Sequence, residues 1–319
     1  MAGGASSPAL TAAVSEAGGL GYLAAGYKTL EEVASEVAEM RGATSGPVGL
    51  NLFVVEPFHP LPEAVDAYRR SLEPEADRLG VILGDPAWDD DGWDAKVEAA
   101  LDLRPEVVSF NFGCPHTAVF RRFAELRIHS LVTVTTVFEA REAVLRGADS
   151  LCAQGPEAGG HRGIWDPGAI PDDQVGLEDL LAAITSEVEV PVMAAGGLTD
   201  ATGVDAVMRR GAVAAQVGTA LLLADEAGTH PVHRAALADK AFTHTDRTRA
   251  FTGRWARGLS NRFMREHADA PAGYPHLHHL TAPLRAAALA RGDAQTAHLW
   301  AGTGYRNIQS APAGKSSAH

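Results

Sequence analysis

The sequence predicts an α/β fold of the (β/α)8 TIM-barrel class, with a first strand that would precede residue 1 and a smaller, mainly helical second domain. Short apolar runs alternate with longer helical patterns up to about residue 228, and the alternation then stops. Near-continuous apolar strands separated by helices indicate a parallel sheet that is buried on both faces. Glycine pairs lie beside several apolar runs, where a backbone turns tightly or approaches a ligand closely.

Seven apolar runs are the predicted strands, at residues 20–25, 48–53, 107–111, 129–134, 150–154, 191–195 and 214–217. The predicted helices between them include 29–41, 62–79, 137–146, 177–186 and 201–210. A closed barrel of this class needs eight strands. The segment Met1-Ala2-Gly3-Gly4, followed by Ser6-Ser7-Pro8, is typical of the loop after a first strand. A doubly wound sheet of seven strands is the structural alternative.

The pattern predicts three regions along the chain. Residues 1–228 form the barrel, and residues 229–309 form a mainly helical domain packed over one mouth of it. Within that second domain, 230–246 and 281–299 are the predicted helices. The tail at 310–319 consists of small and polar residues, which predicts disorder.

Composition excludes several classes of function. The chain has 27 Lys and Arg against 40 Asp and Glu, a formal net charge of −13, which argues against a main task of binding nucleic acid or an anionic membrane. Its apolar stretches fall short of the roughly 18 residues that indicate a membrane span, and no export signal is visible. The two cysteines, Cys114 and Cys152, are too few for a disulfide framework, so a cytoplasmic protein is expected.

Two neighbouring turns at the end of the predicted barrel indicate a phosphate site. One follows the strand that ends at Gly196-Gly197, and the other contains Gln216-Val217-Gly218-Thr219. In such barrels the loops after the last two strands commonly hold a phosphate through backbone N–H groups. Tight turns without a ligand are the alternative. No dinucleotide fingerprint or P-loop follows a strand in this sequence.

A long loop after the fifth predicted strand carries the candidate catalytic residue. Residues 155–176 show little regular pattern, and loops of that length are usually functional or disordered. His161 stands among glycines in this loop and is of the type that transfers protons near neutral pH. Asn51 and Gln154 are amides near strand ends, which suit the edge of a flavin ring. Together with the phosphate turns, they suggest flavin mononucleotide (FMN) as the cofactor.

The chain resembles the nitronate monooxygenases, formerly called 2-nitropropane dioxygenases. The resemblance covers nearly the whole chain and rests on MAGGASSPALTAAVSEAGGLGYLAAGYKT, VGLNLFV, VSFNFGCP, CAQGPEAGGHRG, PVMAAGGL, AAQVGTALLLADEAG, FTGRWARGLSNRF and LWAGTGYR, with EAGGHRG the most specific part. It implies an FMN-binding barrel that needs no metal, with His161 as the catalytic residue. The cofactor-binding positions expected from the turns and from the resemblance are Met1, Ala2, Gly3, Asn51, Gln154, Gly159, Gly196, Gly197, Gln216, Val217, Gly218 and Thr219.

The function expected from the resemblance is oxidation of alkyl nitronates by O2 to a carbonyl product and nitrite, with propionate 3-nitronate as the suggested substrate. Tyr27 and Lys28, after the first predicted strand, are expected to line the substrate pocket. A homodimer is the expected assembly. The alternatives are an FMN-dependent NAD(P)H reductase acting on quinones or enoyl thioesters, and a phosphate-ligand-binding barrel without turnover.

Three other features need an interpretation. The stretch around Cys114 superficially resembles a loop of dihydroorotate dehydrogenases in which the cysteine is a general base, but we interpret Cys114 as a small loop residue. His276, His278 and His279 follow prolines and a glycine, so a solvated loop is favoured over a metal site. The arginines between 247 and 265 are interpreted mainly as domain-packing residues, although an anionic nitronate would favour one nearby cation.

Overall fold

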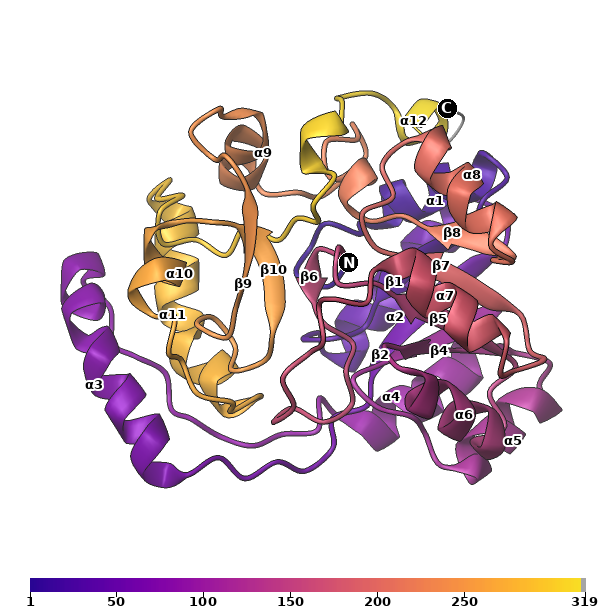
Figure 1. Cartoon of the computed structure of the whole chain (residues 1–319), viewed down its shortest axis with the longest axis horizontal. Coiled ribbons are helices and arrows are strands. Elements are labelled where there is room, and N and C mark those ends of the chain that lie inside the picture. Colours follow the sequence, from indigo (N-terminus) through magenta and orange to yellow (C-terminus); the bar gives the residue numbers. More distant parts are fainter. Residues whose placement is uncertain (317–319) are drawn as a thin grey trace.

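The computed structural model describes residues 1–316 and contains a parallel sheet that curls into an incomplete TIM barrel (Figure 1). Its strand order is β1-β2-β3-β4-β5-β7-β8, so each strand pairs with its neighbours in sequence. The strands are β1 (Gly21–Ala24), β2 (Val48–Phe53), β3 (Val107–Asn111), β4 (His129–Val134), β5 (Ser150–Gln154), β7 (Val192–Ala195) and β8 (Ala214–Gln216). The predicted fold class is confirmed, and all seven predicted strands are present.

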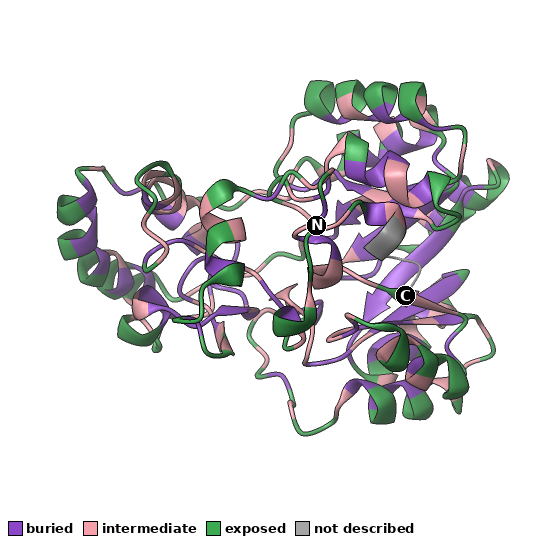
Figure 2. Ribbon diagram, turned by 90° about the horizontal axis from the view of Figure 1, so that it is seen from above, coloured by how far each residue is buried: buried purple, intermediate pink, exposed green. Residues whose placement is uncertain are grey.

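Helices cover the outer face of this sheet. They are α1 (Pro8–Glu16), α2 (Leu30–Ala43), α4 (Trp93–Leu103), α5 (Thr117–Glu125), α6 (Val137–Arg146), α7 (Leu177–Thr185) and α8 (Ala201–Arg209). The sequence specifies several of their starts, because the side chains of Ser7, Thr29 and Asp200 each accept a bond from a backbone N–H of the first turn. Burial is concentrated on the strands and on the helix faces against them (Figure 2). The largest apolar cluster therefore lies between sheet and helices.

The N-terminal residues lie between the two edge strands, β1 and β8. Met1 packs in one apolar cluster with Val217, directly after β8. Ala2 packs with Phe53 at the end of β2 and with Phe112 directly after β3. The first residues therefore connect the carboxyl ends of strands from both sides of the curled sheet, and the N-terminus lies between the two lobes of the molecule (Figure 1).

The second lobe contains more strand than we predicted. It has a three-stranded antiparallel sheet in the order β6-β10-β9, formed by Gly160–His161, Ala256–Leu259 and Thr245–Thr248. The helices α9 (Pro231–Ala238), α10 (Arg262–Glu266) and α11 (His276–Ala290) surround this sheet. The expectation of a mainly helical domain missed these strands because they are two to four residues long and largely polar.

The helix α3 (Pro62–Leu79) has the predicted bounds but packs in the second lobe and not on the barrel. Its Tyr68, Leu72 and Leu79 lie in one apolar cluster with residues of α10 and α11. On the same helix, Glu75 accepts hydrogen bonds from Arg78 and Arg262, each at 2.6 Å. Burial by itself would raise the pKa of Glu75, but the bonds from its partners outweigh it and lower that pKa to about 2.

Other boundaries also differ from the predictions. The helix expected at 230–246 ends at Ala238, and the one expected at 281–299 begins at His276 and ends at Ala290. The tail predicted to be disordered contains the short helix α12 (Ala313–Ser316), whose Ala313 is buried in a cluster with Leu10. Residues 317–319 of that predicted tail lie outside the described residues. No helix within residues 1–316 is long and apolar enough to cross a membrane.

Candidate active site

His161 lies on β6, where the loop after β5 joins the sheet of the second lobe. It pairs with Ala256 of β10, so the long loop is held between the two lobes. Its imidazole contacts three aromatic rings, with centroid distances of 5.6 Å to Phe112, 6.2 Å to Tyr274 and 5.5 Å to Trp300. The predicted catalytic residue therefore stands in an aromatic enclosure that is built from both lobes.

The surroundings of His161 keep its imidazole neutral. Burial, assisted by the positive charges of Arg254 and Arg285, lowers the pKa of His161 to about 3 from its ordinary value of 6.5. Its Nε2 lies 2.9 Å from the hydroxyl oxygen of the buried Thr252, which holds the orientation of the ring. At neutral pH the ring is an uncharged, weakly basic hydrogen-bonding group.

Gln154 holds the His161 loop at the end of β5. Its Nε2 donates to the backbone oxygen of His161 at 3.1 Å, and its Oε1 accepts from the backbone N–H of Gly163 at 2.7 Å. The side chain of Arg162 also donates to the Gln154 backbone oxygen. This amide, predicted to contact the flavin ring, is thus engaged in positioning the His161 loop.

A segment near the C-terminus, Trp300–Thr303, joins the parts of the site. Trp300 contacts the His161 ring, and the backbone N–H of Gly302 donates to the Thr219 hydroxyl at 2.9 Å. The backbone N–H of Thr303 donates to the backbone oxygen of Glu157 at 3.0 Å. The His161 loop and the turn after β8 are therefore connected through one short stretch of chain.

The Trp300–Thr303 segment approaches residue 159 so closely that only glycine fits there. A Cβ on Gly159 would lie 2.4 Å from the backbone nitrogen of Gly302 and 2.5 Å from the carbonyl carbon of Ala301, closer than non-bonded atoms approach. The conformation of Gly159 does not demand glycine, because its φ is not positive. Glycine is required at position 159 only because the neighbouring backbone leaves no room for a Cβ.

The two predicted phosphate turns lie on adjacent strands. Gly196 and Gly197, after β7, have φ values of 127° and 70°, which favour glycine. A hollow of about 400 Å³ lies against them and is lined by Glu157, Gly176, Leu177, Glu178, Asp179, Gly196, Gly197, Leu198, Gly203, Val207, Arg210 and Thr303. The other turn, Gln216–Thr219, is partly accessible and lies beside Met1, whose sulfur would be 3.5 Å from a Cβ on Gly218.

Polar atoms without hydrogen-bond partners lie at the strand ends, and they indicate whether a cofactor ring would fit there. Asn51 donates through Nδ2 to the Ser109 hydroxyl at 2.9 Å, but its Oδ1 makes no hydrogen bond within residues 1–316. Asn111 ends β3, and its buried Oδ1 has no partner there either. Gly3 has a φ of 88° and open space where a Cβ would stand. Acceptors without partners beside an open backbone fit a ligand with N–H donors, as a flavin ring has.

The two predicted substrate residues differ in their surroundings. Tyr27 stacks on His278 at a centroid distance of 4.3 Å, and the Tyr274 hydroxyl donates to the Tyr27 hydroxyl at 3.4 Å. Tyr27 therefore lies beside the His161 enclosure. Burial raises the pKa of Tyr27 to about 12. Lys28 forms an ion pair with Glu36 of α2. Contact of either residue with substrate stays a prediction.

The structure corrects the interpretation of the histidine cluster. His276 and His278 begin α11 and are not in a solvated loop, because the preceding prolines lead into the helix. Burial lowers the pKa of His278 to about 2. No group of three or more metal-binding side chains occurs within the described part of the chain. Cys114 is buried, which raises the pKa of its thiol to about 12 and does not suit a general base.

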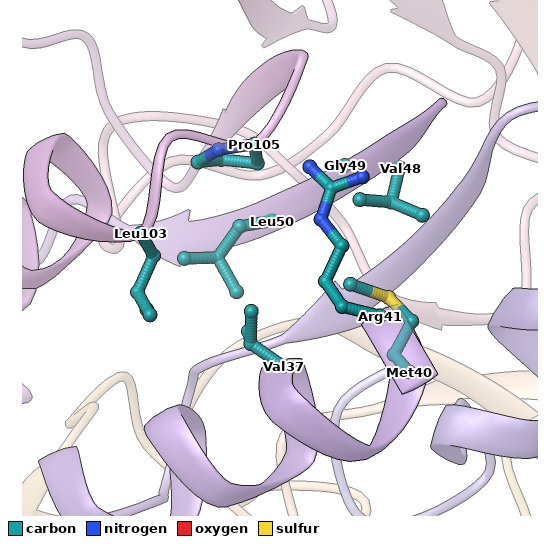
Figure 3. A pocket seen from close by; sticks show the side chains of 8 residues that line it. All are labelled: Val37, Met40, Arg41, Val48, Gly49, Leu50, Leu103 and Pro105. Atoms are coloured by element: carbon teal, nitrogen blue, oxygen red, sulfur yellow. The ribbon is translucent and has the colours of Figure 1, made fainter. Parts of the chain in front are cut away.

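A second hollow lies away from these residues, between α2 and the early part of β2. Val37 and Met40 line it from the helix, and Val48 and Leu50 line it from the strand (Figure 3). It belongs to the edge where strands begin, whereas ligands of such barrels bind where strands end. We assign it no function.

Sequence reasoning missed several residues of the site. Phe112, Tyr274, Arg285 and Trp300 come from separate parts of the chain and meet only through tertiary packing. One signal was available, because Trp300 lies in the LWAGTGYR stretch that carries part of the family resemblance. Phe112 likewise lies in the VSFNFGCP stretch of that resemblance, whereas Tyr274 and Arg285 stand in no local pattern that points to a ligand.

Comparison with known proteins agrees with this fold. A family model described as "Nitronate monooxygenase" matches residues 1–316. The nitronate monooxygenase of Pseudomonas aeruginosa is 36% identical over 327 residues, which cover 97% of this chain and 90% of that protein. A probable nitronate monooxygenase of Staphylococcus saprophyticus is 34% identical, with 96% and 88% covered.

Solved structures show the same likeness. A nitroalkane oxidase from Streptomyces ansochromogenes has a TM-score of 0.96 and 48% identity, and the match covers 99% of this chain and 91% of that one. FabK from Thermotoga maritima has a TM-score of 0.75 and 26% identity, with 99% and 88% covered. The fold and site thus define an oxidoreductase built on an α/β barrel. The chain belongs to the nitronate monooxygenase family, which confirms the resemblance noted in the sequence.

Proposed function

We propose that this enzyme uses FMN and O2 to oxidise alkyl nitronates, of the propionate 3-nitronate type, to a carbonyl product and nitrite. The observation that carries the proposal is the neutral imidazole of His161, enclosed by aromatic rings and linked to the glycine turns through Trp300–Thr303. Family membership supports nitronate oxidation and sets aside a barrel without turnover. The use of FMN and O2 and the identity of the products are details that go beyond family membership and belong to the proposal.

The strand ends supply groups that would hold FMN. Backbone N–H groups of Gly196, Gly197 and Gly218, with the Thr219 hydroxyl, would bind the phosphate. Gly3 would allow the first loop to approach the ring, and the unpartnered oxygens of Asn51 and Asn111 would accept from its N–H groups. When bound, FMN would supply the redox chemistry that passes electrons from nitronate to O2.

The residues of the enclosure prepare the substrate. His161 would orient the nitronate by a hydrogen bond, and Thr252 holds the ring in place for this contact. The rings of Phe112, Tyr274 and Trp300 exclude water around the imidazole, which strengthens polar interactions there. Much of the rate would then come from proximity and orientation.

The test compares His161→Ala and His161→Asn with the parent enzyme in an oxygen electrode. Propionate 3-nitronate and NADH are supplied in separate runs. We expect both variants to keep bound FMN, seen as a yellow protein, and to lose most nitronate-dependent O2 uptake. The exposed His244→Ala variant is the control and keeps full activity. Unchanged turnover in the His161 variants would reject its role, and rapid anaerobic bleaching by NADH would favour the reductase alternative.

A further inference from the structure

Two arginines beside the His161 enclosure have no acidic partner. Arg254 precedes β10, and Arg285 lies on α11. The positive charges of both act on His161 and lower its pKa. Neither forms an ion pair with a carboxylate within residues 1–316, whereas most buried charges in proteins are paired.

Arg254 is the more deeply buried of the two, with 2% of its surface exposed. Its guanidinium carbon lies 4.2 Å from the centre of the Phe112 ring, and one terminal nitrogen donates to the Ile164 oxygen. Its buried Nε has no hydrogen-bond partner among the described residues. This arginine therefore has an unused donor inside the protein.

Arg285 is held by contacts within its own helix. Its Nε donates to the Thr281 hydroxyl at 3.1 Å, and its Nη2 donates to the His278 backbone oxygen at 2.9 Å. His278 in turn stacks on Tyr27. Neutral groups thus fix the guanidinium in position beside the tyrosines without neutralising its charge.

The other titratable groups nearby do not supply the missing negative charge. Tyr27 and Tyr274 are un-ionised at neutral pH, because burial raises the pKa of each phenol. Asp91 is already paired with Lys96 at 2.8 Å. Glu139 and Asp166 act on Arg254 from beyond ion-pair distance. The three half-buried histidines around the pair, His161, His278 and His298, are neutral because desolvation lowers the pKa of each.

We propose that Arg254 and Arg285 hold the negative charge of the nitronate substrate beside the His161 enclosure. The inference rests on the proposed function and deepens it. The two oxygens of a nitronate lie in a plane, as in a carboxylate, and a guanidinium presents paired donors to such a group. His161 would then orient the anion whose charge the arginines hold.

The test compares one compound in two protonation states, nitroethane and its nitronate. We expect Arg285→Gln to raise KM for the nitronate about tenfold or more, with Arg285→Lys recovering part of the loss, while turnover of fresh neutral nitroethane changes less than threefold. Arg254→Lys is the second charge-conserving variant. Arg234→Gln is the matched control, because Arg234 likewise forms no ion pair within the described residues and donates to backbone oxygens away from the site. An unchanged KM for the nitronate in Arg285→Gln would overturn the inference.

A second measurement separates this inference from the proposed function. Calorimetric titration of the holoenzyme with inorganic nitrate, a planar anion that is not oxidised, should show binding that weakens about tenfold in Arg285→Gln and is unchanged in Arg234→Gln. If the parent enzyme binds nitrate in this way but does not oxidise nitronates, the proposed function fails and the anion site stands. If the parent oxidises nitronates and the arginine variants bind nitrate equally well, the anion site fails alone.

Discussion

Replacing Gly159 by alanine tests how closely the C-terminal segment must approach the His161 loop. The added Cβ would meet backbone atoms of Ala301 and Gly302 at 2.4–2.9 Å, so the two segments must separate by about 1 Å to reach ordinary contact. Overpacking of this kind costs about 1–3 kcal/mol, and the upper end applies because no side chain can rotate away. For a chain of this size, about 3 kcal/mol corresponds to a fall in Tm of roughly 4–5 °C.

The same displacement should also lower the rate of the reaction. Gly159 lies two residues before His161, and Trp300 contacts the imidazole from the other side. A misplacement of about 1 Å near reacting groups lowers a rate about 100-fold. We therefore expect kcat/KM with a nitronate to fall by about that factor in Gly159→Ala.

Thermal unfolding and steady-state O2 uptake measure the two effects separately. Gly42→Ala is the matched control, because Gly42 is exposed near the end of α2 and its Cβ would meet no atom within 4 Å. That variant should keep its activity and gain up to about 1 kcal/mol from helix propensity. A Gly159→Ala protein with the parent Tm and kcat/KM would refute the close approach of the two segments.

Two further predictions concern buried charge. Glu75→Gln removes the buried carboxylate that Arg78 and Arg262 share, although the two arginines keep Asp293 and Glu266 as partners. We expect urea unfolding to show a loss of about 1–3 kcal/mol, towards the lower end because of these remaining partners and the partial exposure of the arginines. The same change at the exposed Glu98 should have no effect, and equal losses would argue against the buried network. Below pH 6.5 His161 and His278 become protonated in the unfolded chain. In the folded protein they stay neutral, because their pKa values there are about 3 and about 2. Stability should therefore fall on acidification from pH 6.5 towards 3, by about 1.4 kcal/mol per pH unit for each histidine, and urea midpoints that are equal at pH 7 and pH 5 would contradict their burial.

The barrel could be predicted because its strands carry a local signal. Each strand, such as 48–53 or 150–154, is a run of residues buried on both faces, and the observed bounds agree within two residues. The strands of the second lobe carry no such signal. TDRT at 245–248 is polar and ARGL at 256–259 is only four residues long with an arginine in it, and they form strands because they pair with each other and with the His161 loop.

The candidate site divides in the same way. The glycine turns and the His161 loop follow strands directly, so the barrel topology predicts that they lie at one mouth. Arg254 is one of the arginines from which the sequence predicts a possible cation near the substrate, but Arg285 could not be predicted, because its unpaired charge depends on the neutral side chains packed around it. For the same reason α3 was assigned to the barrel: its apolar face indicates burial but not the partner that buries it.

The second lobe is assembled from stretches that leave the barrel at different strands. One departs after β2 and carries α3, another is the loop after β5, and the largest follows β8 (Figure 1). A body attached at several points around one rim has no single axis about which to swing open. Small molecules would then enter and leave through local shifts of loops and rings. Their entry and release at this mouth would depend on the mobility of individual side chains and not on the opening of a hinge.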